Sequence, residues 1–311
     1  MATFATSSGA VRAAFGGLID YAGLFPPAQL GMETALAEYA AARSGPHAWM
    51  LERFIVPESR LNELLQFGPA PFPLSVIAAT ADDSRTWFAA VQASLQRIAA
   101  HRETGVSIEA IELPLPRPLS QRETYDAAIG QYSAALARSG LADLPSYMEL
   151  PQHDRRNALL PGALASMKRH RLRAKLRCGG VTASSIPPVY DIVTFLRTAA
   201  EERVAFKATA GLHHPVRAYN EESGFVMHGF LNVLTAAALV RQGADEDTVV
   251  ASLEDEDAGH FALDRKGLRW RGTTIDEDAL RGTRADGFQS YGSCSFSEPV
   301  DDLVALGFVA S

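Results

Sequence analysis

The chain has 311 residues, of which 47% are hydrophobic, and its formal net charge is −7 at pH 7. This size and composition can bury a large core and match one α/β domain of ordinary barrel size. The mild negative charge and the lack of a long basic run argue against nucleic acid as the main partner. No apolar run approaches the roughly 18 to 20 residues that cross a bilayer, so we expect no membrane partner and a cytoplasmic location.

Strands and helices are predicted to alternate along the chain, because apolar runs rich in β-branched residues alternate with helical patterns. The predicted strands span 17–25, 48–56, 73–79, 107–115, 146–150, 174–178, 205–210 and 288–296. The predicted helices span 30–43, 60–67, 83–102, 120–139, 154–171, 187–202, 226–242 and 298–306. Eight such pairs predict a (β/α)8 TIM-like barrel in a single domain over 1–311. An open doubly wound sheet is the alternative, but no GxGxxG or GxxxxGK[ST] turn follows an early strand.

The regular alternation breaks between the seventh and eighth strands, where 244–286 predicts an insertion over or beside the barrel mouth. Within it, HFALDRKGLRWRG predicts a β-hairpin with DRKG at the turn. The acidic residues before this hairpin lack the glycine-centred spacing of an EF-hand loop, so a solvated helix face is expected. The preceding apolar stretch FLNVLTAAALV fits either an ordinary barrel helix or a homo-oligomer interface.

Three cations lie on the predicted sixth and seventh strands. Lys175 and Arg177 are two residues apart and share one face, and Lys207 occupies the matching place on the next strand. Lysine is costly to bury, so this group predicts a site for a small anion, with Lys175 and Arg177 as a clamp. Desolvation and like charge should lower the pKa of Lys207 and make it a Schiff-base former or general base. The alternative is a buried ion pair of Lys207 with Glu112 or Glu149.

Further candidate catalytic residues follow the strand ends. Glu112 and Glu149 end the fourth and fifth strands and are predicted acid/base partners, and His213 or His214 after the seventh strand is a predicted proton carrier. A divalent metal held by these carboxylates and one histidine is an alternative, but the three nearby cations would repel it. We therefore expect no cofactor and no metal.

Two glycine- and serine-rich turns predict contacts to the substrate anion. Backbone N–H groups of Gly179 and Gly180 in RCGGVTASS, and of Ser293 and Ser295 in GSCSFSEP, could hold phosphate or carboxylate oxygens. Asp20 falls near the end of the first strand, where an acid could contact substrate. The predicted substrate-binding group therefore comes from three separate strand ends.

Two further pairs have more than one interpretation. Cys178 and Cys294 are too few for a disulfide framework, and each lies beside glycine at a predicted strand end. They could form an acid/base pair or supply a nucleophile, although strand parity favours plain burial of Cys178. Glu52 and Arg53 in LERFIV cannot share a face, so one of them should lie inside the barrel and join an ionic network.

The sequence thus predicts an enzyme that acts on a small anionic carbonyl compound, most simply an aldol-type C–C lyase or synthase. Lysine-bearing barrels include Schiff-base aldolases, and the general arrangement here is similar to theirs. One alternative is a metal-dependent isomerase or lyase that uses Glu112, Glu149 and His213 or His214. Another is a non-catalytic protein that binds a small anion.

Overall fold

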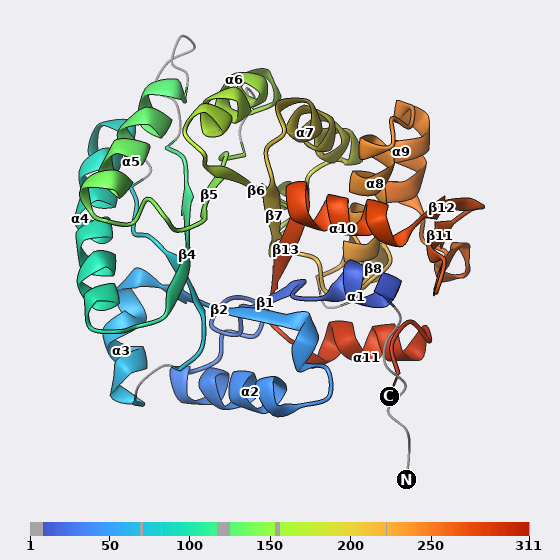
Figure 1. The fold of residues 1–311 in the computed structure, drawn as a ribbon, viewed down its shortest axis with the longest axis horizontal. Coiled ribbons are helices and arrows are strands. Elements are labelled where there is room, and N and C mark those ends of the chain that lie inside the picture. The colour runs from blue at the N-terminus through green and yellow to red at the C-terminus, as the bar shows by residue number, and fades with distance from the viewer. Residues whose placement is uncertain are drawn as a thin grey trace.

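The computed structural model describes residues 9–68, 71–81, 83–116, 125–152, 156–221 and 223–310. Eight parallel strands close into a barrel in the order β1, β13, β7, β6, β5, β4, β3, β2 (Figure 1). They are β1 Ile19–Tyr21, β2 Leu51–Pro57, β3 Leu74–Ile77, β4 Ile108–Pro114, β5 Ser146–Glu149, β6 Arg173–Arg177, β7 Phe206–Thr209 and β13 Phe288–Ser293. Each coincides with a predicted strand, so the (β/α)8 barrel is confirmed.

Helices surround the barrel (Figure 1). They are α2 Met32–Ser44, α3 Leu61–Gln66, α4 Ser84–Glu103, α5 Asp126–Arg138, α6 Arg156–Arg169, α7 Val189–Glu202, α8 Phe230–Arg241 and α11 Ser297–Ala305. Helix α7 buries Ile192, Phe195, Leu196 and Ala199, the i, i+3, i+4, i+7 spacing of one helix face. All eight predicted helices are present, although 120–124 and 154–155 of two of them lie outside the described residues. The helix predicted over 226–242 begins later than expected, at Phe230, because 226 and 227 belong to a short strand.

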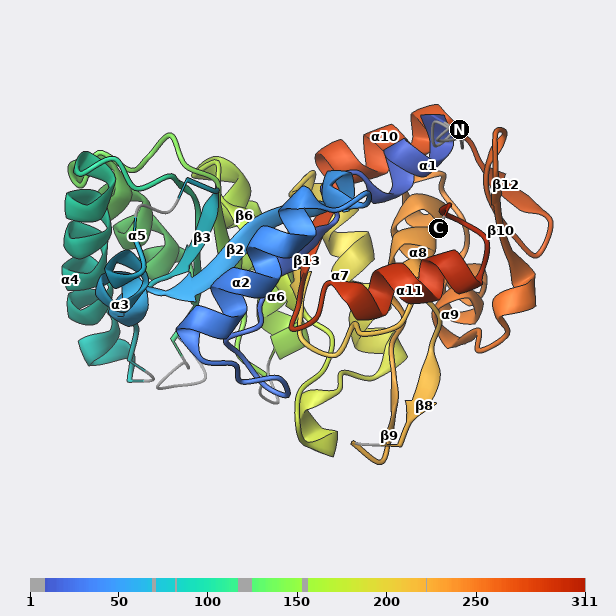
Figure 2. The same ribbon diagram turned by 90° about the horizontal axis from the view of Figure 1, so that it is seen from below.

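Several short elements are not foreseen from the sequence. Helices α1 Gly9–Phe15 and α10 Glu277–Asp286 pack together at the amino ends of β1 and β13 (Figure 2). A hairpin of two strands, β8 Ala218–Asn220 and β9 Phe225–Met227, projects from the opposite end of the barrel (Figure 2). Short 3-10 turns span Ala48–Met50, Glu58–Arg60, Ala183–Ser185 and Ala258–His260. The two ends of the barrel are therefore covered by different parts of the chain.

Residues 246–275 of the predicted insertion lie beside the barrel, against α1, α8 and α10, and the last part of the predicted range, 277–286, is α10 itself (Figure 1). The insertion holds α9 Glu246–Glu254, β10 Phe261–Asp264, β11 Gly267–Trp270 and β12 Thr273–Ile275. The β10–β11 hairpin turns at DRKG as predicted, and β12 adds a third strand. Asp255 joins α9 to this sheet, because it accepts a hydrogen bond from Trp270 Nε1 at 2.8 Å and lies 2.8 Å from Arg271 Nε.

Helix α8 is buried around most of its circumference, from Phe230 to Leu239. Its neighbours are α7, α9, α10 and β12 in addition to the barrel strand β13. The apolar stretch is therefore an ordinary barrel helix whose outer face is covered by the insertion. Among the described residues, no helix is both long enough and apolar enough to cross a membrane.

Candidate functional site

Two lysines share one carboxylate inside the barrel. Lys207 Nζ on β7 lies 2.6 Å from Asp20 Oδ2 on β1 and 2.6 Å from Glu112 Oε1 on β4. Lys175 Nζ on β6 lies 2.9 Å from Glu112 Oε2. The strand register pairs Lys175 directly with Lys207, which is why both side chains reach the same glutamate.

The series of charges continues toward the carboxyl end of the barrel. Lys175 Nζ also lies 3.5 Å from Glu149 Oε2, and Glu149 Oε1 accepts a hydrogen bond from Arg177 Nε at 2.7 Å. Exposure of the side chains rises in this direction, from 1% at Lys207 to 8% at Lys175 and 36% at Arg177. We call the following residues the ionic chain: Asp20, Lys207, Glu112, Lys175, Glu149 and Arg177. Its open end is Arg177.

Uncharged and basic neighbours complete the buried half of the ionic chain. Ser75 Oγ donates to Glu112 Oε1 at 2.6 Å, and Ser290 Oγ donates to Asp20 Oδ2 at 2.7 Å. The backbone N–H of Arg53 donates to Asp20 Oδ1 at 3.1 Å, and the Arg53 guanidinium lies 3.8 Å from the same oxygen. Arg53 is therefore the inward residue of LERFIV. Sequence reasoning missed both serines, although each is a polar residue at an inward position of an apolar strand.

The predicted fall in the pKa of Lys207 is wrong. Burial alone would lower it, but the carboxylates of Asp20 and Glu112 more than offset burial and raise the pKa of Lys207 well above its ordinary value. The pKa of Lys207 is set mainly by neighbouring anions, whereas the sequence pattern indicated neighbouring cations. Lys207 is thus a stable ammonium in a buried ion pair, the alternative that the sequence left open.

The same pairing acts on the shared glutamate. Burial alone would raise the pKa of Glu112, but Lys175, Lys207 and the Ser75 hydroxyl outweigh burial and hold that pKa well below its usual range. Asp20 is fully buried beside Lys207, inside the barrel instead of at its mouth. Its expected place at the substrate-contacting end of β1 is therefore corrected.

The alternative metal site does not form in the described part of the chain. Lys175 lies between Glu112 and Glu149 and contacts both, so an ammonium occupies the space between the two predicted ligands. No group of three or more His, Cys, Asp or Glu side chains among the described residues could hold a metal ion. The histidines that were to complete this site have other partners.

His213 and His214 lie against α11. His213 Nδ1 is 3.8 Å from Cys294 Sγ and 3.3 Å from Glu298 Oε2, and His214 Nδ1 is 2.7 Å from Asp302 Oδ2. The hydrogen bonds to Cys294 and Glu298 raise the pKa of His213 to about 10 against the opposing effect of burial. Neither imidazole is paired with a member of the ionic chain within the ranges that the structure describes.

The glycine turns after β6 and β7 have a clear packing role. A Cβ on Gly179 would lie 2.8 Å from Gly211 Cα, and a Cβ on Gly180 would lie 2.6 Å from Ser185 Cβ. Gly211 also has a φ of +74°, in the left-handed region. These glycines therefore let two loops approach each other at the mouth, and their contact with an anion stays a prediction.

The other candidate residues near the carboxyl end are placed as follows. Ser295 Oγ accepts a hydrogen bond from the Glu298 N–H at 3.2 Å, so Ser295 satisfies a backbone donor in the first turn of α11. Ser293 is buried, and its backbone carbonyl accepts from the Ala22 N–H at 2.6 Å. Cys178 is buried in the hydrophobic core, as strand parity predicted.

Similarity to known proteins adds no independent assignment of this site. No model of a known protein family matches the chain, and no curated protein matches it either. The chemistry of the ionic chain is therefore the basis for assigning a function.

Proposed function

We propose that this protein is a barrel enzyme acting on a small carbonyl compound that carries a carboxylate or phosphate, with an aldol-type C–C cleavage or formation as its reaction. The closed (β/α)8 barrel is a fold that commonly carries enzymes, with catalytic groups at the carboxyl ends of the strands. The proposal rests on one observation. A lysine, a carboxylate and an arginine lie in contact at that end, as Lys175, Glu149 and Arg177.

The reacting amine in this proposal is Lys175 and no longer Lys207. Lys207 is 1% exposed and donates to two carboxylates at 2.6 Å, so attack on a carbonyl would require both contacts to break. Lys175 is nearer the mouth, and its second carboxylate contact, to Glu149, is a longer 3.5 Å. A substrate carbonyl could therefore displace one contact of Lys175 while Glu112 still orients the amine.

The remaining roles follow from position. Glu149, at 3.5 Å from Lys175 Nζ, accepts the ammonium proton; the amine then attacks the carbonyl carbon, forming a C–N bond with loss of water. Glu149 returns this proton to the departing hydroxyl, which leaves as water, and the protonated imine takes up the electron pair of the C–C bond that breaks and becomes an enamine. The freed Glu149 carboxylate accepts the hydroxyl proton of the departing fragment, which leaves as a carbonyl compound. Glu149 then protonates the enamine carbon, and hydrolysis of the imine by water releases the product and restores Lys175. Arg177 presents a half-exposed guanidinium fork to the carboxylate or phosphate of the substrate. Lys207 keeps Glu112 charged and in place.

Borohydride trapping tests this assignment sharply, because the sequence has only four lysines: Lys168, Lys175, Lys207 and Lys266. Lys168 and Lys266 are exposed and serve as internal controls for non-specific labelling. The protein is incubated with sodium borohydride and pyruvate, glyoxylate or dihydroxyacetone phosphate, and then digested for peptide mass mapping. We expect one adduct mass on the Lys175 peptide and its loss in Lys175→Met, with no loss in Lys168→Met.

Two results would contradict the proposal. Labelling that is equal on the surface lysines and Lys175 would show ordinary amine reactivity. A specific adduct on Lys207 would restore the original assignment and exclude Lys175 as the reacting amine.

A further inference from the structure

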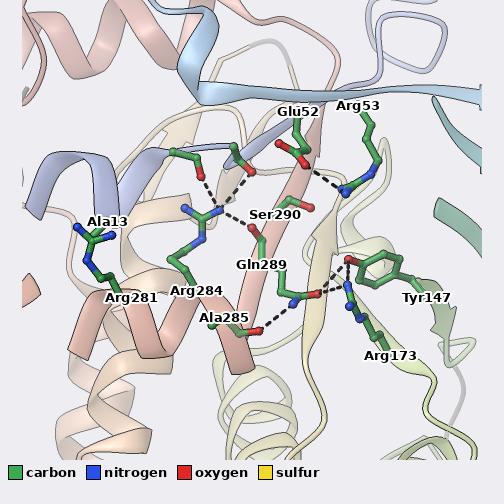
Figure 3. A pocket seen from close by; sticks show the side chains of 12 residues that line it. Ala13, Glu52, Arg53, Tyr147, Arg173, Arg281, Arg284, Ala285, Gln289 and Ser290 are labelled. Carbon is green, nitrogen blue, oxygen red and sulfur yellow. Dashed lines mark hydrogen bonds and ion pairs between the residues drawn. The ribbon is translucent and has the colours of Figure 1, made fainter. Parts of the chain in front are cut away.

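The amino end of the barrel, opposite the proposed active site, holds a pocket lined by arginines. Its volume is about 470 Å³, within the range of sites for small ligands. Arg53, Arg173, Arg281 and Arg284 line it, against a single carboxylate among the lining residues, that of Glu52 (Figure 3). In a protein with a net charge of −7, this is a local excess of positive charge.

Arg173 stands in the wall of this pocket and is held by uncharged groups. Its Nη1 donates to Tyr147 Oη at 2.9 Å and to Gln289 Oε1 at 2.9 Å (Figure 3). Its guanidinium also lies 5.5 Å from the centre of the Tyr147 ring. Within the described residues Arg173 has no ion pair with a carboxylate, so its charge is oriented without being neutralised.

A second basic pocket, of about 730 Å³, adjoins the first and shares Arg173 and Gln289 with it. Lys168, Arg197, Arg203 and Arg241 line it, against the carboxylates of Glu201 and Asp286. Cations therefore outnumber carboxylates on both sides of Arg173.

The second pocket also holds a buried guanidinium N–H, the Nε group of Arg197, that has no hydrogen-bond partner among the described residues. In the first pocket the Arg53 guanidinium is already compensated, because it lies 3.1 Å from Glu52 Oε1 and 3.7 Å from Glu109 Oε2. A buried donor left unpaired is costly, and an anionic oxygen is the acceptor that a guanidinium binds best. The unpaired donor of Arg197 therefore points to a ligand, in addition to the excess charge around Arg173.

We propose that these adjoining pockets form one site for a small molecule that carries linked phosphate groups, with one group on each side of Arg173. Several guanidinium forks match phosphate oxygens better than a single ammonium would. The site lies at the amino ends of β2, β6 and β13, far along the barrel from the strand ends that carry catalysis in this fold. It is thus a binding site separate from the chemistry proposed above.

Inorganic tripolyphosphate is a suitable probe, because it has linked phosphates and no carbonyl that could react with a lysine. Calorimetric titration of the full chain at low salt should show saturable binding at least about tenfold tighter than that of orthophosphate. Arg173→Gln should weaken tripolyphosphate binding about tenfold or more. Arg265→Gln removes an exposed arginine from the β10–β11 turn, outside both pockets, and should change the affinity less than about twofold.

A second variant keeps the test valid if Arg173→Gln does not fold. Arg281 is 58% exposed on α10 at the edge of the first pocket, and Arg281→Gln should weaken binding by about threefold. Wild-type protein that does not bind tripolyphosphate, or binding that is unchanged by both pocket variants, would overturn the proposal.

The outcome is also separable from that of the proposed function. Lys175→Met should lose the borohydride adduct and keep tripolyphosphate affinity. Loss of tripolyphosphate affinity in Lys175→Met would place the ligand at the carboxyl end and make the assignment to the amino end wrong.

Discussion

At the carboxyl end of the barrel, each cation of the ionic chain contacts a carboxylate, whereas at the amino end Arg173 and Arg284 contact uncharged oxygen atoms. Arg284 donates to the backbone carbonyls of Ala14, Gly16 and Gly17, and Arg173 to Tyr147 and Gln289. Both ends are rich in basic residues, but the partners differ. Paired charges position one another, whereas unpaired charges remain available to an incoming anion or hold carbonyl groups in place.

The largest expected effect comes from removing Lys207, the most deeply buried cation of the ionic chain. Lys207→Met leaves Asp20 and Glu112 buried without their shared ammonium, and should lower the free energy of unfolding by about 3 to 5 kcal/mol. Urea denaturation measures this change. Lys168→Met, at an exposed lysine, is the control and should cost less than about 0.5 kcal/mol. If the two variants lose equally little stability, the buried pairing does not hold the barrel together.

The next largest effect distinguishes an arginine that stabilises the fold from one that only lines the pocket at the amino end of the barrel. Arg284→Met removes the donors to several backbone carbonyls between α1 and β13 and should cost about 2 to 3 kcal/mol of stability. Arg281→Gln, one helical turn away on α10, breaks only an exposed pair with Glu277 and should cost less than about 0.5 kcal/mol. Thermal and urea unfolding of the two variants compare them. Equal stability would assign Arg284 to the ligand site instead of to the fold.

The smallest effect concerns pH and the protonation of His213 at the carboxyl end of the barrel. Since Cys294 and Glu298 raise the pKa of His213 to about 10, its protonated form is favoured by folding. Its contribution to stability is full below its ordinary pKa of 6.5 and is lost as the pH rises toward 10. His213→Gln should therefore cost about 1 kcal/mol at pH 6 and progressively less toward pH 10.

An NMR titration of the His213 ring checks the cause directly. Cys294→Ala removes the hydrogen bond that contributes most to the shift, so the midpoint should fall from about 10 toward 6.5. A midpoint near 6.5 in the wild-type protein would mean that the contacts of His213 with Cys294 and Glu298 do not favour its charged form.

The barrel could be predicted because its signals are local. Eight apolar runs alternate with helical patterns, and each run became a strand of the closed sheet. Helix α1 is only seven residues long and α10 is polar apart from a few positions, so neither gives a strong periodic signal. Their place at the amino end is set by packing against each other and β13, which periodicity does not encode.

The residues of the ionic chain could be predicted from the sequence, but the direction in which they shift the pKa of Lys207 could not. Strand parity placed Lys175 and Lys207 together, because both lie on neighbouring strands with a register that sequence spacing anticipates. The carboxylate that contributes most to raising the pKa of Lys207 is that of Asp20, which is 187 positions away in the sequence. That contact depends on closure of the barrel between β1 and β13. The sequence did contain a signal that buried carboxylates should face these lysines, since two of only four lysines lie on barrel strands.

The ionic chain also limits which amino-acid substitutions this protein can accept in evolution. Replacing one interior member leaves its neighbour charged and uncompensated, whereas replacing two adjoining members with apolar residues of similar volume is often neutral or stabilising. Substitutions at Asp20 and Lys207 should therefore be inherited together, and a related chain that lacks the acid should lack the lysine too. Arg177, whose side chain is 36% exposed, leaves a less costly gap in the fold when it is replaced, so its retention would reflect binding of the substrate anion more than stability.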